Sequence, residues 1–394
     1  MASGVPFVDL RSQHDIVRGE IEAAIADLID RSSFIGGDAL QRFEKSFAQY
    51  LGVREVLGVA NGTDGLWLSL AALGVGSGDA VITVPNTFIA TVEAITRLGA
   101  YPLFVDIDLA TATMDVELLR QLLENDCTRL DDGRIVHLAT GRRVAAVLPV
   151  HLYGLPADMP ALMELAEAYG LPIVEDACQA HGASCLIDGE WKRAGAIGAA
   201  AAFSFYPAKN LGAMGDGGAV ATDDPELAAK MRRLRDHGQS ERYIHVTPEG
   251  WNSRLDAIQA AILDIKLKHL DRWNAARRAA AAHYQAALEG LPLILPVEPD
   301  YAEPVYHLFV VRAPDREVLR RELGARGIGT GLHYPVPLHL QEAYRHLGHT
   351  LGAFPRAEES AATLLSLPMH PSLTQAQIEQ VAEACHEILV PVPA

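Results

Sequence analysis

The sequence of 394 residues lacks several features that identify common classes of protein. No apolar run reaches the roughly 18 residues that a membrane-spanning helix needs, so we expect no membrane protein. Residues 1–15 contain no basic segment followed by an apolar one, so we expect no export signal and a cytoplasmic location. The formal net charge of −17 argues against the basic surface with which proteins bind nucleic acids or anionic membranes.

Cysteine is scarce as well, and the cysteines form no C-x-x-C pair. We therefore expect reduced structural thiols, not a disulfide framework or a zinc site, at Cys127, Cys178, Cys185 and Cys385. The histidines show no regular i, i+4 spacing, and we expect no metal centre. A G-x-G-x-x-G loop is also missing, because the nearest candidate, residues 73–81, follows a helix and precedes a strand. That order excludes a Rossmann-type dinucleotide site.

What the sequence does contain is an alternation of short apolar runs with helical segments. Continuous apolar strands joined by helices predict an α/β fold with a mostly parallel, seven-stranded central sheet flanked by helices. The predicted strands are 55–60, 80–84, 101–107, 144–150, 171–177, 200–206 and 217–222. Ligands of such sheets bind at the carboxyl ends of the strands, in the loops that follow.

The pattern also suggests a division into regions. Residues 1–30 form a helical segment that packs on the small domain or on a partner subunit, and residues 31–253 form the large α/β domain. Residues 254–290 keep a helical period and predict one long connecting helix. Residues 291–394 form a smaller α+β domain.

One lysine, Lys209, stands in the small-residue and glycine-rich stretch FSFYPAKNLGAMGDGGAV, residues 203–220. It follows a predicted strand, so it should lie at the edge of the sheet where ligands bind. A lysine at such a place can form a Schiff base with a carbonyl compound or with pyridoxal phosphate. The alternative is a loop lysine that points into water, as most lysines do.

A pair of carboxylates, Glu175 and Asp176, ends another predicted strand. A carboxylate there could pair with the pyridine nitrogen of pyridoxal phosphate and keep it protonated. Gln179 follows closely and could donate a hydrogen bond to the ring hydroxyl. The alternative is that both carboxylates simply begin a solvated loop.

Groups that suit a phosphate and a flat ring occur elsewhere. Gly62 and Thr63 stand where a strand passes into a helix, and N–H groups at a helix N-terminus bind anions. Ser204 is a further phosphate donor, and Phe88 could stack on a flat cofactor. Thr63 could equally be an ordinary N-cap, and Phe88 an ordinary core residue.

Together these segments resemble the DegT/DnrJ/StrS family of sugar aminotransferases. The matching stretches follow the family's order over nearly the whole chain: NGTDGL (61–66), PNTFIAT (85–91), VHLYGLPADM (150–159), VEDACQAHGA (174–183), FSFYPAKNLGAMGDGGAV (203–220), LRDHGQ (234–239), WNSRLDAIQAAIL (251–263) and LHYPVPLHLQ (332–341). The resemblance implies a fold type I pyridoxal-phosphate enzyme, built as a homodimer with shared active sites.

The resemblance also implies residue roles. Lys209 would be the Schiff-base lysine and the acid–base catalyst of the proton shift, and Asp176 would pair with the pyridine nitrogen. Asn252 would reach a phosphate in the neighbouring subunit's site. The implied cofactor contacts are Gly62, Thr63, Phe88, Asp176, Gln179, Ser204, Lys209 and Asn252.

The family's reaction takes an amino group from L-glutamate, which leaves the cofactor in its pyridoxamine form, and gives it to a keto sugar. Residues 203–218 and 237–256 are closer to members that act on dTDP-3-keto-6-deoxyhexoses. The implied substrate contacts are Tyr206, Arg242, Tyr243, His333 and Tyr334.

Other activities stay open at this point. A nucleotide-linked 4-keto sugar, a 3-keto-uronate or a keto-cyclitol could be the acceptor. A dehydratase branch of the family carries histidine in place of the lysine, and Lys209 argues against it. Loss of Lys209, Asp176 or the phosphate loop would have favoured a non-catalytic regulator that binds pyridoxal phosphate, and all three are present.

Overall fold

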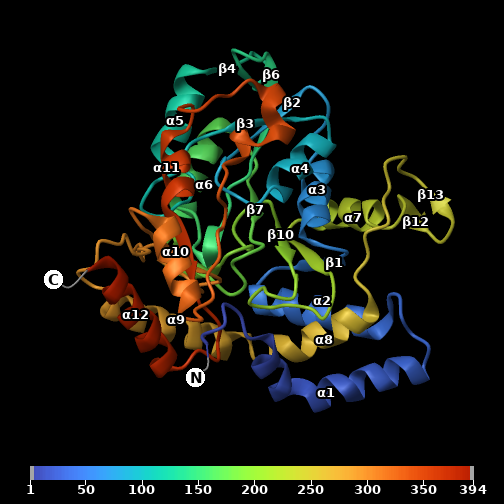
Figure 1. The fold of residues 1–394 in the computed structure, drawn as a ribbon. Coiled ribbons are helices and arrows are strands. Elements are labelled where there is room, and N and C mark those ends of the chain that lie inside the picture. Colours follow the sequence, from blue (N-terminus) through green and yellow to red (C-terminus); the bar gives the residue numbers. More distant parts are fainter. Residues whose placement is uncertain (1–3, 391–394) are drawn as a thin grey trace.

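The computed structural model describes residues 4–390 of the chain. Its helices (Figure 1) are α1 (Leu10–Asp30), α2 (Gly37–Leu51), α3 (Gly62–Ala72), α4 (Ala90–Arg97), α5 (Val116–Asn125), α6 (Met159–Tyr169), α7 (Pro225–Leu234), α8 (Ala257–Leu267), α9 (Leu270–Ala287), α10 (Arg316–Ala325), α11 (Pro355–Thr363) and α12 (Gln375–Leu389). None of the helices in this part of the chain combines the length and the apolar character that a membrane crossing requires.

The strands are mostly short. They are β1 (Glu55–Val59), β2 (Asp79–Thr83), β3 (Tyr101–Phe104), β4 (Cys127–Arg129), β5 (Ile135–His137), β6 (Arg142–Val147), β7 (Val174–Asp176), β8 (Ser184–Ile187), β9 (Glu190–Arg193), β10 (Ala200–Ser204), β11 (Gly218–Thr222), β12 (Gln239–Glu241), β13 (Ile244–His245), β14 (Ala302–Glu303), β15 (Phe309–Arg312) and β16 (Leu364–Leu367).

The predicted central sheet is confirmed, in the order β3-β2-β6-β7-β10-β11-β1. Its two halves are joined by parallel bridges between β6 and β7, from Val147 to Ile173 and from Val150 to Asp176. The β2–β3, β2–β6 and β7–β10 pairs are parallel, whereas β11 runs antiparallel to β10 and to β1. The reason for the exception is that a loop, not a helical crossover, connects β10 to β11.

Helices cover both faces of this sheet, and β10 shows how the strands divide their side chains. Ala200 and Ala202 belong to the core that α3, α4 and α7 form on one face. Ala201 and Phe203 belong to the core that α2 and α8 form on the other. This alternation is the two-residue period of a strand buried on both faces.

The segment predicted as one long connecting helix is two helices, α8 and α9. The chain leaves the helical pattern at Lys268 and His269, where the His269 N–H bonds to the Lys266 carbonyl in a tighter turn. α8 packs on α1 and α2, and α9 packs on α12 (Figure 1). The prediction of a single helix was wrong. The break contains no glycine or proline that would reveal it in the sequence, and it falls where the packing partner changes.

The last third of the described chain has α+β character. β15 and β16 pair antiparallel, and α10 and α12 pack against them around Phe309, Leu319 and Val381. α9 contributes Tyr284 to the same core, with its ring 4.9 Å from that of Phe309. This region supplies one wall of the cavity described next.

Candidate active site

A cavity of about 510 Å³ lies at the carboxyl ends of β7 and β10. It is also lined by the β1–α3 turn, by the β2–α4 loop and by residues from the C-terminal region. Of the residues predicted for the site, it gathers Gly62, Thr63, Phe88, Asp176, Gln179, Ser204, Tyr206, Lys209, His333 and Tyr334. Residues that are distant in sequence thus converge where an open α/β sheet binds its ligands.

Lys209 lines the cavity, so the alternative of a lysine that points into bulk water is wrong. Burial lowers the pKa of the Lys209 ammonium below its usual value, while Cys178 and Asp176 act in the opposite direction. A lowered pKa increases the fraction of neutral amine, which is the form that attacks a carbonyl.

The chain around Lys209 is held by backbone and side-chain contacts. The Lys209 N–H donates to the Tyr206 carbonyl at 2.8 Å. The next residue, Asn210, donates its side-chain amide to Asn274 of α9 at 2.9 Å and to the Val305 carbonyl at 3.0 Å. Because Asn210 is 1% exposed, these bonds fix the start of the loop that carries the lysine.

Asp176 faces the same cavity and is 5% exposed. Its Oδ2 accepts a hydrogen bond from the Thr91 hydroxyl at 2.8 Å, and its Oδ1 accepts one from the Cys178 N–H at 3.2 Å. The Lys209 side chain lines the same wall. The arrangement places a carboxylate and an amine in one cavity.

Glu175, the neighbouring carboxylate, points the other way and is fully buried. It accepts a hydrogen bond from His151 Nε2 at 2.9 Å and three from backbone N–H groups within residues 195–198. Burial alone raises the pKa of Glu175, but the bonds from His151 and the backbone bring it below its usual value. The alternative of a solvated loop is therefore wrong for both carboxylates, and only Asp176 serves the cavity.

The start of α3 forms a cradle for an anion. Asn61, and not Thr63, is the N-cap, since its side chain accepts from the Asp64 N–H at 2.8 Å. A Cβ atom on Gly62 would lie 2.7 Å from Ser204 Cβ, so only glycine allows this approach of α3 to β10. The N–H groups of the first helical turn have no acceptor within the helix and attract negative charge.

Aromatic and polar groups form the remaining walls. Phe88 is 51% exposed, so it is not a core residue, and its ring lies 5.6 Å from that of Tyr334. Gln179 donates to the Tyr334 hydroxyl at 3.2 Å and accepts from the Tyr153 N–H at 2.7 Å.

His333 lies on the wall formed by the C-terminal region. Its ring stacks on Phe7 at 5.7 Å, and its Nδ1 lies 2.8 Å from the Ser366 hydroxyl. Burial, with a smaller effect from Lys209, lowers the pKa of His333 to about 4. His333 is therefore neutral near pH 7 and can exchange hydrogen bonds with an uncharged ligand.

Three predicted residues do not line the cavity of this chain. Arg242 and Tyr243 lie at the exposed β12–β13 hairpin, where Arg242 donates to the Tyr243 hydroxyl at 3.1 Å. Asn252 is exposed and forms a bridge with Asp236. These residues can act at a site only if they reach the cavity of another subunit.

Other residues of the cavity wall were not predicted from the sequence: Phe7, Val8, Asn61, Leu66, Thr87, Ala90, Thr91, Val150, Cys178, Ala208, Asp216, His307, Leu308 and Met369. For two of them a signal was present, because Thr87 and Thr91 stand four residues apart in the PNTFIAT stretch. Phe7, His307 and Met369 come from distant segments that only the fold brings to this wall.

These groups fit the predicted cofactor. The cavity has an amine with a lowered pKa at Lys209, a carboxylate at Asp176 and an exposed aromatic ring at Phe88. The glycine-lined cradle at Gly62 suits a phosphate. Pyridoxal phosphate combines the aldehyde, the basic ring nitrogen, the flat ring and the phosphate that these residues would bind.

Comparison with known proteins agrees with this geometry. The profile of the DegT/DnrJ/EryC1/StrS aminotransferase family matches residues 15–386. A dTDP-3-amino-3,4,6-trideoxy-alpha-D-glucose transaminase of Streptomyces venezuelae is 47% identical over 384 residues, 97% of this chain and 96% of that protein.

Two solved structures share the fold over nearly the whole chain. S. venezuelae DesV, in complex with a ketimine intermediate, aligns with a TM-score of 0.91 and 45% identity over all of both chains. NtdA from Bacillus subtilis, with bound cofactor PMP, aligns with a TM-score of 0.86 and 29% identity over 99% of this chain and 86% of that one.

Proposed function

Since the chain belongs to the DegT/DnrJ/EryC1/StrS aminotransferase family, we propose that it uses pyridoxal phosphate to move an amino group from L-glutamate to a nucleotide-linked keto sugar. The proposed acceptor is a dTDP-3-keto-6-deoxyhexose, which is aminated at C-3 for amino-sugar biosynthesis. The similarity to the Streptomyces venezuelae dTDP-3-amino-3,4,6-trideoxy-alpha-D-glucose transaminase supports this choice.

One observation carries the proposal, namely that Lys209 and Asp176 line the same cavity at the ends of neighbouring strands. An amine with a lowered pKa can attack a carbonyl and afterwards hold and release a proton at its Nζ. A buried carboxylate stabilises positive charge that develops beside it. The two groups together suit proton transfer at a carbon next to nitrogen.

Pyridoxal phosphate supplies the carbonyl and the electron-withdrawing ring that this chemistry needs. The residues that line the cavity would hold it in place: Gly62, Thr63 and Ser204 at the phosphate, Phe88 on the ring, Gln179 at the ring hydroxyl and Asp176 at the ring nitrogen. Lys209 holds and moves the proton. Because it is fixed by its loop within the cavity, the transfer is effectively intramolecular.

The keto sugar is proposed to contact Tyr206, His333 and Tyr334 at the open side of the cavity. Tyr206 is 57% exposed there, and the neutral His333 can accept or donate a hydrogen bond to a sugar hydroxyl. We assign Arg242 and Tyr243 to the diphosphate of a substrate in the neighbouring subunit, because neither residue lines the cavity of its own chain.

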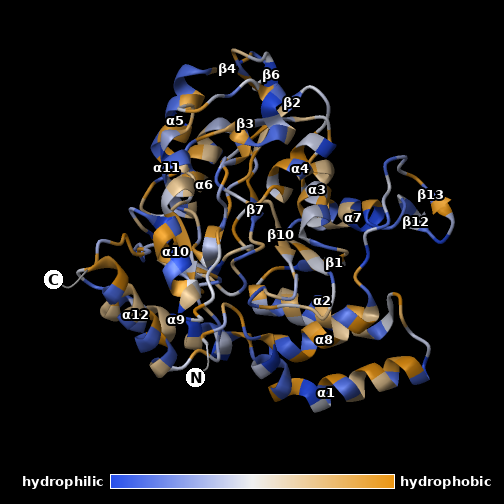
Figure 2. Ribbon diagram, viewed as in Figure 1, coloured by the Kyte–Doolittle hydropathy of each residue, from blue (hydrophilic) through white to orange (hydrophobic). Residues whose placement is uncertain are grey.

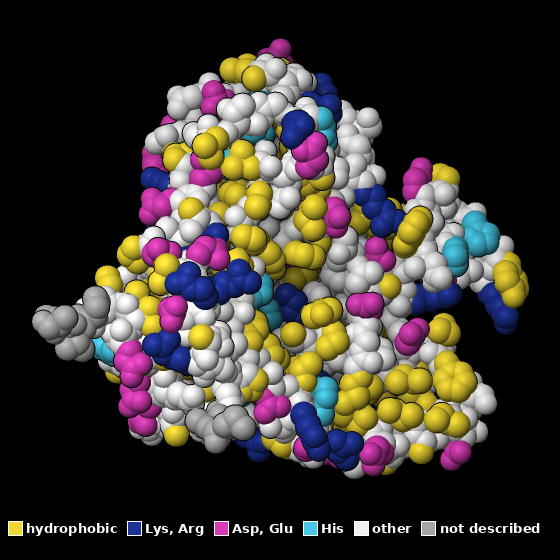
Figure 3. Space-filling view, in the orientation of Figure 1, with side chains coloured by type: hydrophobic (Ala, Val, Ile, Leu, Met, Phe, Trp, Pro, Cys, Tyr) yellow, Lys and Arg dark blue, Asp and Glu magenta, His cyan; other side chains and the backbone are white. Residues whose placement is uncertain are grey.

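A homodimer with shared sites is part of the proposal. The β12–β13 hairpin projects from the side of the molecule (Figure 1). Neither Asn252 nor Tyr243 lines the cavity of its own chain, and Tyr243 is 75% exposed. Hydrophobic residues, drawn orange in Figure 2, mark the outer helix α1 and the hairpin at β13. The space-filling view shows hydrophobic side chains gathered over α1 and α8 (Figure 3). A second copy of the chain would cover such a surface.

The first test is the visible absorption spectrum of the protein with pyridoxal phosphate, before and after addition of L-glutamate. We expect a yellow band that disappears with L-glutamate, and no such band with Lys209→Ala, which lacks the amine. Lys230→Ala is the control, since Lys230 lies outside the cavity. A wild-type protein without the band, or a Lys209→Ala protein that still transaminates, would contradict the proposal.

The acceptor is tested separately, by mass spectrometry of the products formed from dTDP-linked 3-keto and 4-keto sugars, a 3-keto-uronate and a keto-cyclitol. We expect the dTDP-3-keto-6-deoxyhexose to be aminated fastest. Faster amination of any other acceptor would contradict the assignment to C-3 of a deoxyhexose and leave the aminotransferase activity intact.

A further inference from the structure

Two threonine hydroxyl groups lie in the cavity wall and have no part in the function proposed above. Thr87 and Thr91 are 3% and 1% exposed, and both line the cavity that contains Asp176. Their hydroxyl oxygens are 2.9 Å apart, and Thr91 Oγ1 lies 2.8 Å from Asp176 Oδ2. The three groups form a continuous chain of hydrogen bonds that ends on the carboxylate.

The direction of these hydrogen bonds follows from the chemistry of the groups. An ionised carboxylate can only accept, so Thr91 donates its single O–H to Asp176. The Thr91 oxygen has no second hydrogen to offer, and it therefore accepts from the Thr87 hydroxyl. Both hydroxyl groups therefore donate in the same direction, Thr87 to Thr91 and Thr91 to Asp176.

The carboxylate of Asp176 keeps acceptor positions free for a ligand. The Cys178 N–H occupies one lone pair of Oδ1, and Thr91 occupies one of Oδ2. Each carboxylate oxygen has two lone pairs, so a further one remains on each. Glu175, by contrast, accepts four hydrogen bonds from the protein. Of the two carboxylates, only Asp176 is both held in place by the protein and still able to accept a hydrogen bond from a ligand.

We propose that Thr91 is a positioning residue for Asp176, with Thr87 behind it. The Thr91 hydroxyl holds Oδ2 so that the carboxylate presents its free lone pairs to the ring nitrogen of the cofactor. The inference rests on the proposed function, since it concerns the partner that Asp176 takes there. It assigns the PNTFIAT stretch a hydrogen-bonding role in addition to the aromatic contact of Phe88.

The experiment measures the dissociation constant of the apoprotein for two probes by absorption titration. One probe is pyridoxal phosphate, and the other is its deaza analogue, in which a CH group replaces the ring nitrogen. The variants are Thr91→Val, which keeps the shape and loses the hydroxyl, Thr91→Ser, which keeps the hydroxyl and loses a methyl group, and Thr87→Val. Thermal unfolding of each variant is measured in parallel.

We expect Thr91→Val to raise the dissociation constant for pyridoxal phosphate about tenfold, which corresponds to about 1.4 kcal/mol. The deaza analogue should bind this variant as it binds the wild type, because it offers Asp176 no ring nitrogen. Thr91→Ser should bind both probes as the wild type does. Thr87→Val should weaken binding of pyridoxal phosphate less than Thr91→Val, since the direct bond to Asp176 remains.

A packing role gives the opposite order, with Thr91→Ser more impaired than Thr91→Val, and that order would overturn the inference. Equal losses for both probes would overturn it too, because the effect would then not pass through the ring nitrogen. If Thr91→Val does not fold, Thr91→Ser and Thr91→Ala, which differ only by the hydroxyl, give the same comparison. A wild-type protein that binds neither probe would overturn the proposed function as well.

Discussion

At the scale of single residues, Glu175 and Asp176 are neighbours on β7 whose side chains point in opposite directions and therefore have different functions. The Glu175 carboxylate accepts four hydrogen bonds and has no exposed surface. The Asp176 carboxylate accepts two and faces the cavity. In a strand, successive side chains point to opposite sides. One carboxylate therefore stabilises the loop before β10, and the other is free to act on a ligand.

We predict that Glu175→Gln lowers the free energy of unfolding by about 3 kcal/mol, because the new amide group would meet backbone N–H donors with its own N–H. The pKa of Glu175 is below its usual value of 4.5 in the folded protein. Its contribution to stability is thus complete above pH 4.5 and is lost as the pH falls through the lower folded value.

Denaturant unfolding at pH 7 and at acidic pH checks this prediction, with the exposed Glu167→Gln on α6 as the control. The difference between the wild type and Glu175→Gln should shrink on acidification. A difference that stays constant with pH would mean that the ionised carboxylate is not what stabilises this loop.

At the scale of elements, helices α8 and α9 hold the loop between β10 and β11. Gln259 exchanges hydrogen bonds with the backbone of Met214, and Lys266 donates to the Gly212 carbonyl. Lys266 has no exposed surface, and its Nζ lies 3.4 Å from Nε2 of His14 on α1. The position of the lysine loop thus depends on helices that come later in the chain.

Lys266 gives this contact a pH dependence. Burial lowers its pKa from 10.5 to about 8. Between these two values the unfolded chain binds more protons than the folded protein, so stability rises with pH across this window. We predict that the wild type gains stability relative to Lys266→Met, by on the order of 3 kcal/mol from pH 8 to pH 10.5.

Thermal unfolding of both proteins across this range provides the measurement. Subtracting the stability of Lys266→Met from that of the wild type removes the contribution of the other groups that titrate in this pH range. The exposed Lys268→Met is the matched control. A difference between the wild type and Lys266→Met that does not change with pH would contradict the assignment.

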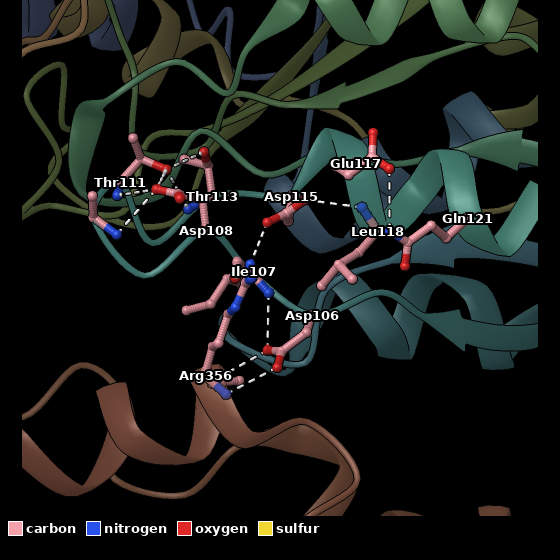
Figure 4. A network of polar contacts seen from close by, with 12 residues as sticks. Asp106, Ile107, Asp108, Thr111, Thr113, Asp115, Glu117, Leu118, Gln121 and Arg356 are labelled. Atoms are coloured by element: carbon pink, nitrogen blue, oxygen red, sulfur yellow. Dashed lines mark hydrogen bonds and ion pairs between the residues drawn. The ribbon is translucent and has the colours of Figure 1, made fainter.

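A second contact between elements joins α11 to the α/β region. Asp106 accepts hydrogen bonds from the N–H groups of Arg356 and Ala357, each at 2.9 Å, and the Arg356 side chain pairs with Asp115 (Figure 4). The residue that precedes α11, Phe354, has no side-chain cap. Asp106 therefore performs the function of an N-cap from a distant part of the chain.

We predict that Asp106→Ala lowers the free energy of unfolding by about 1–2 kcal/mol, as the loss of an N-cap does. Cofactor binding should be unchanged, since Asp106 does not line the cavity. Denaturant unfolding and a titration with pyridoxal phosphate measure the two effects, with the exposed Asp131→Ala as the control. Unchanged stability would show that α11 does not need this cap.

At the scale of the whole molecule, the proposed dimer makes a prediction about mixed variants. Lys209→Ala and Asn252→Ala should each be inactive or severely impaired alone. A mixed dimer would contain one site with both intact residues if Asn252 acts across the interface. Random reassociation of equal amounts should then restore roughly a quarter of the wild-type activity.

The mixture is assayed after unfolding and refolding together, and the two variants refolded separately and then mixed are the control. No recovery in the mixed dimers would mean that Lys209 and Asn252 do not combine across subunits. Size-exclusion chromatography with light scattering on the same samples would show whether dimers form at all.

Much of the central sheet could be predicted from the local pattern of apolar residues in the sequence. Apolar runs of strand length predicted the seven central strands, and the position of Lys209 after one of them predicted a place at the ligand edge of the sheet. The break between α8 and α9 was not predictable in this way, because residues 268–269 carry no helix-breaking signal. Nor could the pattern say which of Glu175 and Asp176 faces the cavity.

The strands, the order of the motifs and the residue types that can form imines and bind phosphate were all predictable from the chain's amino acids. These properties depend on short-range periodicity and on side-chain chemistry. The folded chain was needed to show that Thr91 contacts Asp176, that Lys266 contacts Gly212 and that His333 lies beside Phe7. Such contacts join segments far apart in the chain, and the packing of helices on the sheet determines which of them form.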